Sequence, residues 1–98
     1  MSQADYIPIE NLVKPDLGRM WISNRPNDLG FPEVGDIVSV KVTADVELYI
    51  RVEGINGTII FGEVEKIGPQ PSERFERWEC GSKVSFEQRY ISCVFRED

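Results

Sequence analysis

The chain of 98 residues contains no histidine and only two cysteines. Histidine is the commonest general base and the commonest zinc ligand, so its absence excludes Ser–His and Cys–His catalysis. Two cysteines without histidine cannot build a four-ligand structural zinc site. Carboxylate catalysis stays open because 17 residues are acidic, although no pair stands out by its spacing. The sequence therefore predicts a protein that is not an enzyme and that uses no cofactor and no metal ion.

The chain has only two cysteines, Cys80 and Cys93, which are too few for a disulfide framework. We expect both thiols to be reduced and at least partly buried, because small or apolar residues flank them. No apolar run approaches the roughly 20 residues of a membrane-spanning helix. Residues 1–5 also lack the basic and apolar regions of a signal peptide. These absences predict a cytoplasmic protein that does not contact a membrane.

Acidic residues outnumber basic ones, 17 to 11, so the chain has a formal net charge of −6. Nucleic-acid binding needs a basic surface, so this balance argues against it. The acidic residues are spread along the chain without a block of like charges, which is typical of a solvated surface. Hydrophobic residues make up 41% of the chain and charged residues 29%, as in an ordinary folded protein of one domain.

The strongest structural pattern lies between residues 36 and 67. Apolar and polar residues alternate in 37–43 and in 48–53, which is the period of half-buried strands. Asn56-Gly57 then predicts a hairpin with a type I′ turn, leading into a third strand over 58–66. Gly62 inside this third strand predicts a bulge or a close backbone approach.

The rest of the chain is predicted to add two strands and a short helix. Gly68 to Ser72 is a loop, and 72–78 is expected to form one or two helical turns with Ser72 as N-cap. Alternation returns in 83–86 and in 90–95, which predicts the fourth and fifth strands. Residues 6–9 and 19–22 are candidates for short edge strands, since Pro8 is not compatible with a central one.

Five short strands with glycine turns predict an all-β fold, either a small, strongly bent five-stranded sheet or an SH3-like, partly open barrel. An OB-like barrel is the alternative. We divide the chain into an irregular N-terminal segment (1–33) packed on the sheet and a single barrel-like domain (34–98).

The order of features between residues 41 and 95 resembles a bacterial family of unknown function that includes the YegJ-like proteins. The resembling elements are the strand 46–52, the glycines at 57 and 62, the proline loop 69–71, and the Gly-x-x-Val strand that begins at Gly81. Tyr49 occupies a position where tryptophan is usual in the family. The resemblance implies a fold of this type and no established activity.

Tyr49, Arg51 and Glu53 are expected to share the outer face of one strand. Aromatic and arginine side chains dominate binding hot spots, so this row is a candidate recognition surface. The alternative is cross-strand pairing on a solvated face, which we favour.

A second candidate is formed by Arg74 and Trp78, with Phe75 and Arg77 between them. On a helix, positions i and i+4 share a face, so the two side chains would form an aromatic and cationic platform for an anion or peptide. The alternative, which we favour, places Trp78 and Phe75 in the core.

Trp21, flanked by Met20 and Ile22, is the third candidate. These side chains either anchor the N-terminal segment or form an exposed docking or oligomerisation patch.

Two classes of function remain compatible with the sequence. The first is a non-catalytic protein-interaction module (an accessory, inhibitor or immunity-type small protein) that is a monomer or a weak homodimer. One version works by acidic mimicry of nucleic acid, and it requires one continuous negative face made by Asp45, Glu47, Glu53, Glu63 and Glu65. The second function is a small-molecule or peptide binder, or a minimal carboxylate enzyme, with a cleft near Trp78.

Overall fold

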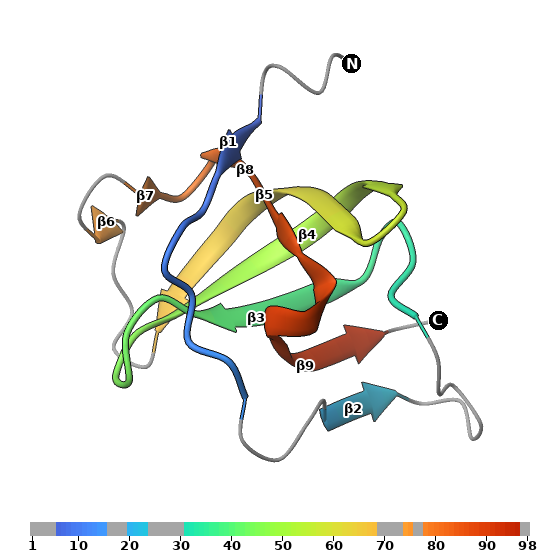
Figure 1. The fold of residues 1–98 in the computed structure, drawn as a ribbon, viewed down its shortest axis with the longest axis horizontal. Coiled ribbons are helices and arrows are strands. Elements are labelled where there is room, and N and C mark those ends of the chain that lie inside the picture. Colours follow the sequence, from blue (N-terminus) through green and yellow to red (C-terminus); the bar gives the residue numbers. More distant parts are fainter. Residues whose placement is uncertain (1–5, 16–19, 24–30, 69–73, 76–77, 97–98) are drawn as a thin grey trace.

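The computed structural model describes residues 6–15, 20–23, 31–68, 74–75 and 78–96. This part of the chain is all-β, as predicted, and forms a single open mixed sheet together with a separate two-stranded ribbon. Figure 1 shows a strongly curved sheet, in which β8 crosses in front of β4 and β5 while β9 lies beside β3. The strand order is β1-β8-β5-β4-β3-β9-β2.

Five strands carry most of the sheet, and each lies where alternation of apolar residues predicted one. They are β3 (Ile37–Lys41), β4 (Glu47–Asn56), β5 (Ile59–Gly68), β8 (Lys83–Glu87) and β9 (Ile91–Arg96). A 3-10 turn, Gln88–Tyr90, joins β8 to β9. All neighbours among the five are antiparallel.

The core lies inside the curve of this sheet. Alternate residues of each strand point inward, so burial follows the period of two that the sequence shows. The side chains that are almost completely buried are Val38, Val40, Leu48, Ile50, Val52, Ile60, Val64, Ile67, Val84, Ile91 and Val94. Ile9, Trp78 and Phe86 complete the cluster.

The β4–β5 hairpin is confirmed, but its turn lies one residue later than predicted. Asn56 pairs with Ile59, so the central residues are Gly57 and Thr58. Among these residues Gly57 alone has a positive φ, of 63°. A type I′ turn needs positive φ at both central positions, so that prediction is wrong; glycine at the first central position suits a type II′ turn.

Gly62 lies at a close approach of the β4 backbone, as predicted. The pairing register shifts between Val52 and Gly54 opposite this residue. A Cβ atom on Gly62 would lie 2.2 Å from the carbonyl oxygen of Arg51. Only glycine leaves room for the neighbouring backbone at this position.

Two short strands extend the sheet at its ends, so the described sheet has seven strands rather than five. β1 (Ile7–Pro8) runs parallel to β8, and β2 (Met20–Ser23) runs parallel to β9. Both had been candidates for edge strands, and in Figure 1 they lie at opposite ends of the sheet. The sheet therefore does not close within the described residues.

The helical turns predicted over 72–78 are wrong. β6 (Arg74–Phe75) and β7 (Trp78–Glu79) form an antiparallel ribbon in which Phe75 pairs with Trp78. A stretch this short gains little helical stability by itself, so tertiary pairing decides its conformation. None of the described segments forms a helix with the length and apolar character needed to cross a bilayer.

A buried ion pair joins the start of β3 to the end of the chain. The Arg96 guanidinium donates to the Asp36 carboxylate through Nε at 3.0 Å and through Nη2 at 2.8 Å. The same carboxylate accepts a bond from the backbone N–H of Glu33 at 2.7 Å, and Arg96 Nη2 also donates to the carbonyl oxygen of Phe31 at 3.1 Å. Both charged groups are at most 8% exposed, so each depends on the other for compensation.

Candidate functional site

The recognition row predicted on β4 lies on one face of the strand. Leu48, Ile50 and Val52 are buried, whereas Tyr49, Arg51 and Glu53 point to the opposite, outer face. The alternation of the sequence was sufficient to place these side chains. Their contacts, however, separate the row into two parts with different surroundings.

Arg51 and Glu53 belong to a network of ion pairs across three strands. Arg51 pairs with Glu65. Lys83 Nζ donates to both oxygens of Glu53 at 2.8 Å and also lies 3.4 Å from Glu63. The hydrogen bond from Lys83 is the main reason that the pKa of Glu53 lies below its ordinary value. This part of the row matches the alternative interpretation, cross-strand pairing on a solvated face.

Tyr49 belongs instead to an apolar surface. Its ring lies 6.0 Å from the ring of Phe95, in a tilted arrangement. The pKa of the Tyr49 hydroxyl is raised, first by burial and then by the nearby Glu47 carboxylate. Lys66 Nζ lies 5.5 Å from the ring centroid, close enough for a cation–π contact.

Pairing between the strands extends this surface to the edge of the sheet. Ile22 pairs with Phe95, which pairs with Ile37 on its other side. One row away, Met20 pairs with Cys93. Paired residues of neighbouring strands point to the same face. The outer face therefore carries one continuous surface, which we call the apolar strip: Met20, Ile22, Ile37, Tyr49, Cys93 and Phe95.

The apolar strip is accessible and slightly hollowed. Met20 is 63% exposed and Ile22 is 50% exposed. Ile37, Tyr49 and Phe95, together with Glu65 and Lys66, line a shallow depression of about 590 Å³. Charged side chains therefore border an apolar centre, as in protein–protein interfaces.

The structure accordingly joins two of the three predicted candidates. The Met20 and Ile22 neighbours of Trp21 meet the Tyr49 end of the recognition row through Phe95 and Ile37. Trp21 lies in β2 between Met20 and Ile22. Sequence reasoning missed Phe95, Ile37 and Cys93 as parts of this surface, because only the order of strands reveals that β2, β9, β3 and β4 are neighbours.

The third candidate, Arg74 with Trp78, does not form the expected platform. In the ribbon Arg74 pairs with Glu79, not with a residue one helical turn away. Trp78 is 5% exposed and packs in the core. The indole therefore offers little surface to a ligand.

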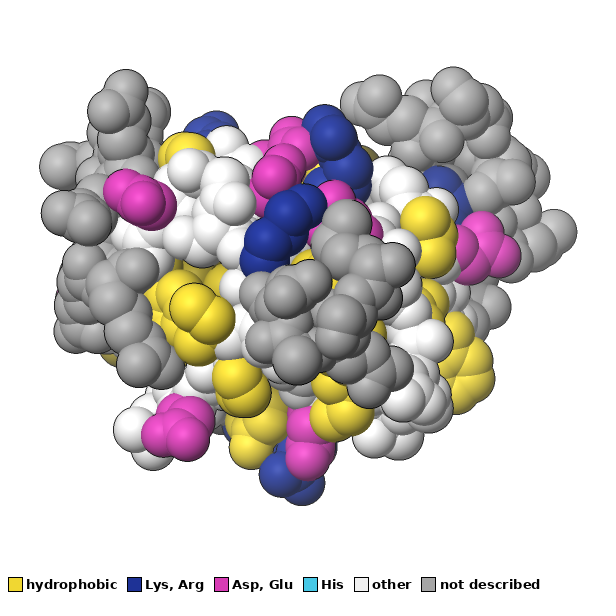
Figure 2. All heavy atoms as spheres, turned by 90° about the horizontal axis from the view of Figure 1, so that it is seen from above, with side chains coloured by type: hydrophobic (Ala, Val, Ile, Leu, Met, Phe, Trp, Pro, Cys, Tyr) yellow, Lys and Arg dark blue, Asp and Glu magenta, His cyan; other side chains and the backbone are white. Residues whose placement is uncertain are grey.

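The five acidic residues that nucleic-acid mimicry requires do not form an uninterrupted negative face. Lys83 lies between Glu53 and Glu63, and Arg51 pairs with Glu65. Figure 2 shows acidic and basic side chains side by side on the face that it presents. Because charges of both signs are interleaved, these residues do not present the continuous negative surface that acidic mimicry of nucleic acid requires.

The two thiols differ in their surroundings. Cys80 is exposed in the turn after β7, which contradicts the prediction that it is at least partly buried. The glycine that follows it has φ of 96°, a backbone conformation that suits a tight turn. Cys93 is half-buried in the apolar strip, and this burial is the main cause of the raised pKa of its thiol.

Within the described residues, no three His, Cys, Asp or Glu side chains gather in a cluster that could hold a metal ion. Comparison of the chain with protein-family models, with curated proteins and with solved structures finds no match. The resemblance to the YegJ-like proteins therefore stays a prediction.

Proposed function

We propose that this protein is a non-catalytic protein-interaction module that binds another protein through the apolar strip. The observation that carries the proposal is the continuity of exposed and half-buried apolar side chains across β2, β9, β3 and β4. Aromatic residues and methionine are enriched at interfaces, and a charged rim is usual around them. Burying the remaining exposed surface of Met20 and Ile22 would contribute about 1 kcal/mol each, roughly half the value for a fully exposed side chain.

We also propose that the scaffold is an SH3-like barrel that stays open at one side. Two features support this interpretation. The last strand, β9, lies beside the first long strand, β3, in the order β8-β5-β4-β3-β9. A 3-10 turn also separates β8 from β9. Cytoplasmic location and a monomeric or weakly dimeric state are predictions from the sequence that accompany this proposal.

The test compares variants of the full chain as bait in a native lysate of the source cells. Met20→Glu combined with Ile22→Glu places two charges on the most exposed part of the strip. Ile55→Glu is the matched control, since Ile55 is 43% exposed but lies near the β4–β5 turn, outside the strip. We expect a protein that the wild-type chain and the control variant retain and that the strip variant loses.

Circular dichroism of the three baits verifies that each is folded. Equal capture by the strip variant would contradict the proposed binding face. Failure of the folded wild-type chain to retain any protein would contradict the proposed function itself.

A further inference from the structure

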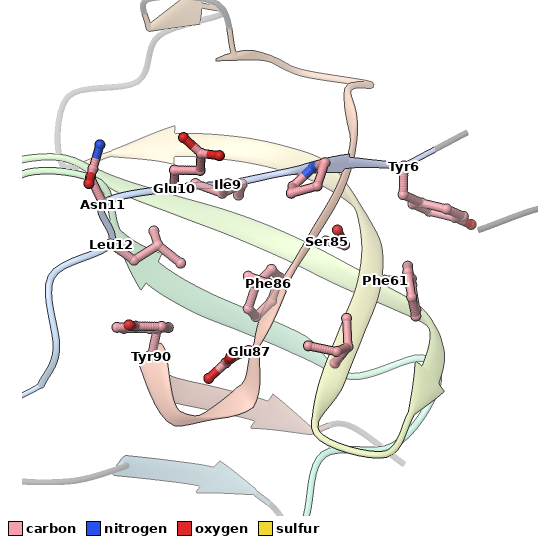
Figure 3. A pocket seen from close by; sticks show the side chains of 12 residues that line it. Tyr6, Ile9, Glu10, Asn11, Leu12, Phe61, Ser85, Phe86, Glu87 and Tyr90 are labelled. Atoms are coloured by element: carbon pink, nitrogen blue, oxygen red, sulfur yellow. The ribbon is translucent and has the colours of Figure 1, made fainter. Parts of the chain in front are cut away.

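The seven-stranded sheet ends in two edge strands, and the first of them, β1, is protected against pairing with another chain. It spans two residues, and one of these is Pro8, which has no backbone N–H to donate. The exposed Glu10 follows along the same edge. The hollow beside this edge (Figure 3) has nearly buried walls, such as Ile9, Phe61 and Phe86, and offers little apolar surface. Short length, proline and charge all disfavour strand addition, so this edge does not suit a partner strand.

The second edge strand, β2, carries neither proline nor charge in its four residues, Met20–Ser23. Within the described residues β2 pairs on one side only, with β9, and Figure 1 shows it as the outermost strand at that end of the sheet. An edge strand directs a row of N–H and C=O groups away from the sheet, where the ladder supplies no partner. Met20 is 63% exposed and Ile22 is 50% exposed, so apolar side chains accompany these backbone groups. This edge therefore suits a further strand.

The β2 edge of a second copy of this chain has the chemistry that such a strand needs. An added strand supplies backbone hydrogen bonds along the edge and apolar side chains at alternate positions. Two identical β2 edges provide both to each other. Each copy has a net charge of −6, which opposes association in general. Because β2 itself contains no charged residue, pairing it with an identical strand brings no like charges directly opposite each other.

The direction of the side chains restricts the register of two paired β2 strands. Met20 and Ile22 lie on the outer face with their partners Cys93 and Phe95. Directly opposite residues of antiparallel strands point to the same face. A twofold axis beside Trp21 therefore pairs Met20 of each copy with Ile22 of the other and keeps both outer faces on one side. An axis beside Ile22 would leave Met20 without a β2 residue opposite it, so the axis at Trp21 covers more apolar surface.

We propose that two copies of this chain pair through their β2 edges, antiparallel and about a twofold axis beside Trp21, to form one continuous sheet. The contact is isologous and uses the β2 edge of both copies, so it closes as a dimer. The two apolar strips then lie side by side on the outer face and form one surface of twice the length. Because the paired segment is only four residues long, the dimer belongs to the class of small, weak interfaces.

Charges placed at the two exposed positions of β2 test both the pairing and its register. A mixed variant, Met20→Lys with Ile22→Glu, puts opposite charges across from each other twice in each dimer. A lysine variant, Met20→Lys with Ile22→Lys, and a glutamate variant, Met20→Glu with Ile22→Glu, put like charges there instead. Each of these two should dimerise at least about tenfold more weakly than the mixed variant, because cross-strand charge pairs act twice. An equimolar mixture of the lysine and glutamate variants should regain dimerisation.

NMR of the ¹⁵N-labelled full chain measures the dimer at protein concentrations between about 0.02 and 1 mM, a range suited to weak interfaces. A reducing agent is present throughout because Cys80 is exposed. For the wild-type chain we expect the diffusion coefficient to fall with concentration while the amide signals of Met20 and Ile22 shift. Tyr49→Lys is the matched control, since Tyr49 lies in the apolar strip but is separated from β2 by β3 and β9. It should dimerise like the wild-type chain.

Three outcomes would overturn edge pairing. The first is a wild-type chain that stays monomeric over the whole concentration range. The second is equal dimerisation of the mixed, lysine and glutamate variants. The third is loss of the dimer in Tyr49→Lys, which indicates that two apolar strips pack face to face instead. A monomeric wild-type chain that still retains a protein from lysate overturns this proposal alone and leaves the proposed function in place.

Discussion

Gly62 shows how one residue type at one position allows the long β4–β5 hairpin to form. The backbone of β4 approaches so closely that a side chain at Gly62 would overlap the Arg51 carbonyl. Sequence reasoning identified this glycine because it interrupts a strand pattern. It did not identify the register shift of the opposite strand, because that shift depends on how both strands curve around the core.

Gly62→Ala is therefore expected to destabilise the protein by about 2–4 kcal/mol, since its Cβ would overlap the Arg51 carbonyl and the Ile50 side chain. Gly54→Ala is the matched control in the same hairpin. There the nearest atom, Cβ of Phe61, lies 4.0 Å from the added Cβ, and a change below about 1 kcal/mol is expected. Urea unfolding measures both. Equal losses would contradict the close-approach argument.

At the scale of elements, β1 is held less by its own ladder than by a side-chain network. Its pairing with β8 spans two residues. Tyr6, which precedes β1, donates through its hydroxyl to Glu53 of β4 at 3.0 Å, and its ring meets Phe61 edge-on at 5.3 Å. Lys83 of β8 binds the same carboxylate. Glu53 therefore couples three elements through one charged group.

This coupling predicts a pH dependence of stability. The pKa of Glu53 is lowered from its ordinary value of 4.5, mainly by Lys83. Between the folded and unfolded values the native state binds fewer protons, so stability rises with pH through that window. The contribution is complete above about pH 4.5 and is lost as the pH falls through the lower, folded value. The raised pKa of Lys83 adds a contribution that is lost at strongly alkaline pH.

Glu53→Gln should therefore flatten the acid side of the stability profile between pH 2 and pH 5, as measured by the urea midpoint at each pH. Asp45→Asn, at an exposed position in the β3–β4 turn, should keep the wild-type slope. A steep acid limb that persists unchanged in Glu53→Gln would contradict the role of the network.

For the molecule as a whole, the Asp36–Arg96 pair joins the end of β9 to the residue that precedes β3. The two residues are 60 positions apart, and their contact fixes the last strand to the segment that enters the first long strand. Sequence reasoning singled out neither residue. Nothing local distinguishes them from other acids and bases, because their burial depends on β9 lying beside β3.

Asp36→Asn should cost about 3 kcal/mol of unfolding free energy, because it removes the buried carboxylate that pairs with a buried guanidinium. Asp36→Asn combined with Arg96→Met should cost less than the single substitution, since the buried charge is gone. Glu33→Gln, at the exposed side of the same cluster, should change stability by less than about 0.5 kcal/mol. A double variant that loses more than the single one would contradict the buried-pair argument.

The sequence by itself determined the all-β class, the five long strands and the inward faces of those strands, because alternation of apolar residues is a local property that burial of one face dictates. It also placed Tyr49, Arg51 and Glu53 on the outer face. Tertiary structure alone decided which strands are neighbours, and therefore that Tyr49 joins Phe95 and the Met20–Ile22 patch while Arg51 and Glu53 form ion pairs. Contacts between residues far apart in the chain depend on strand order, which alternation within one strand does not encode.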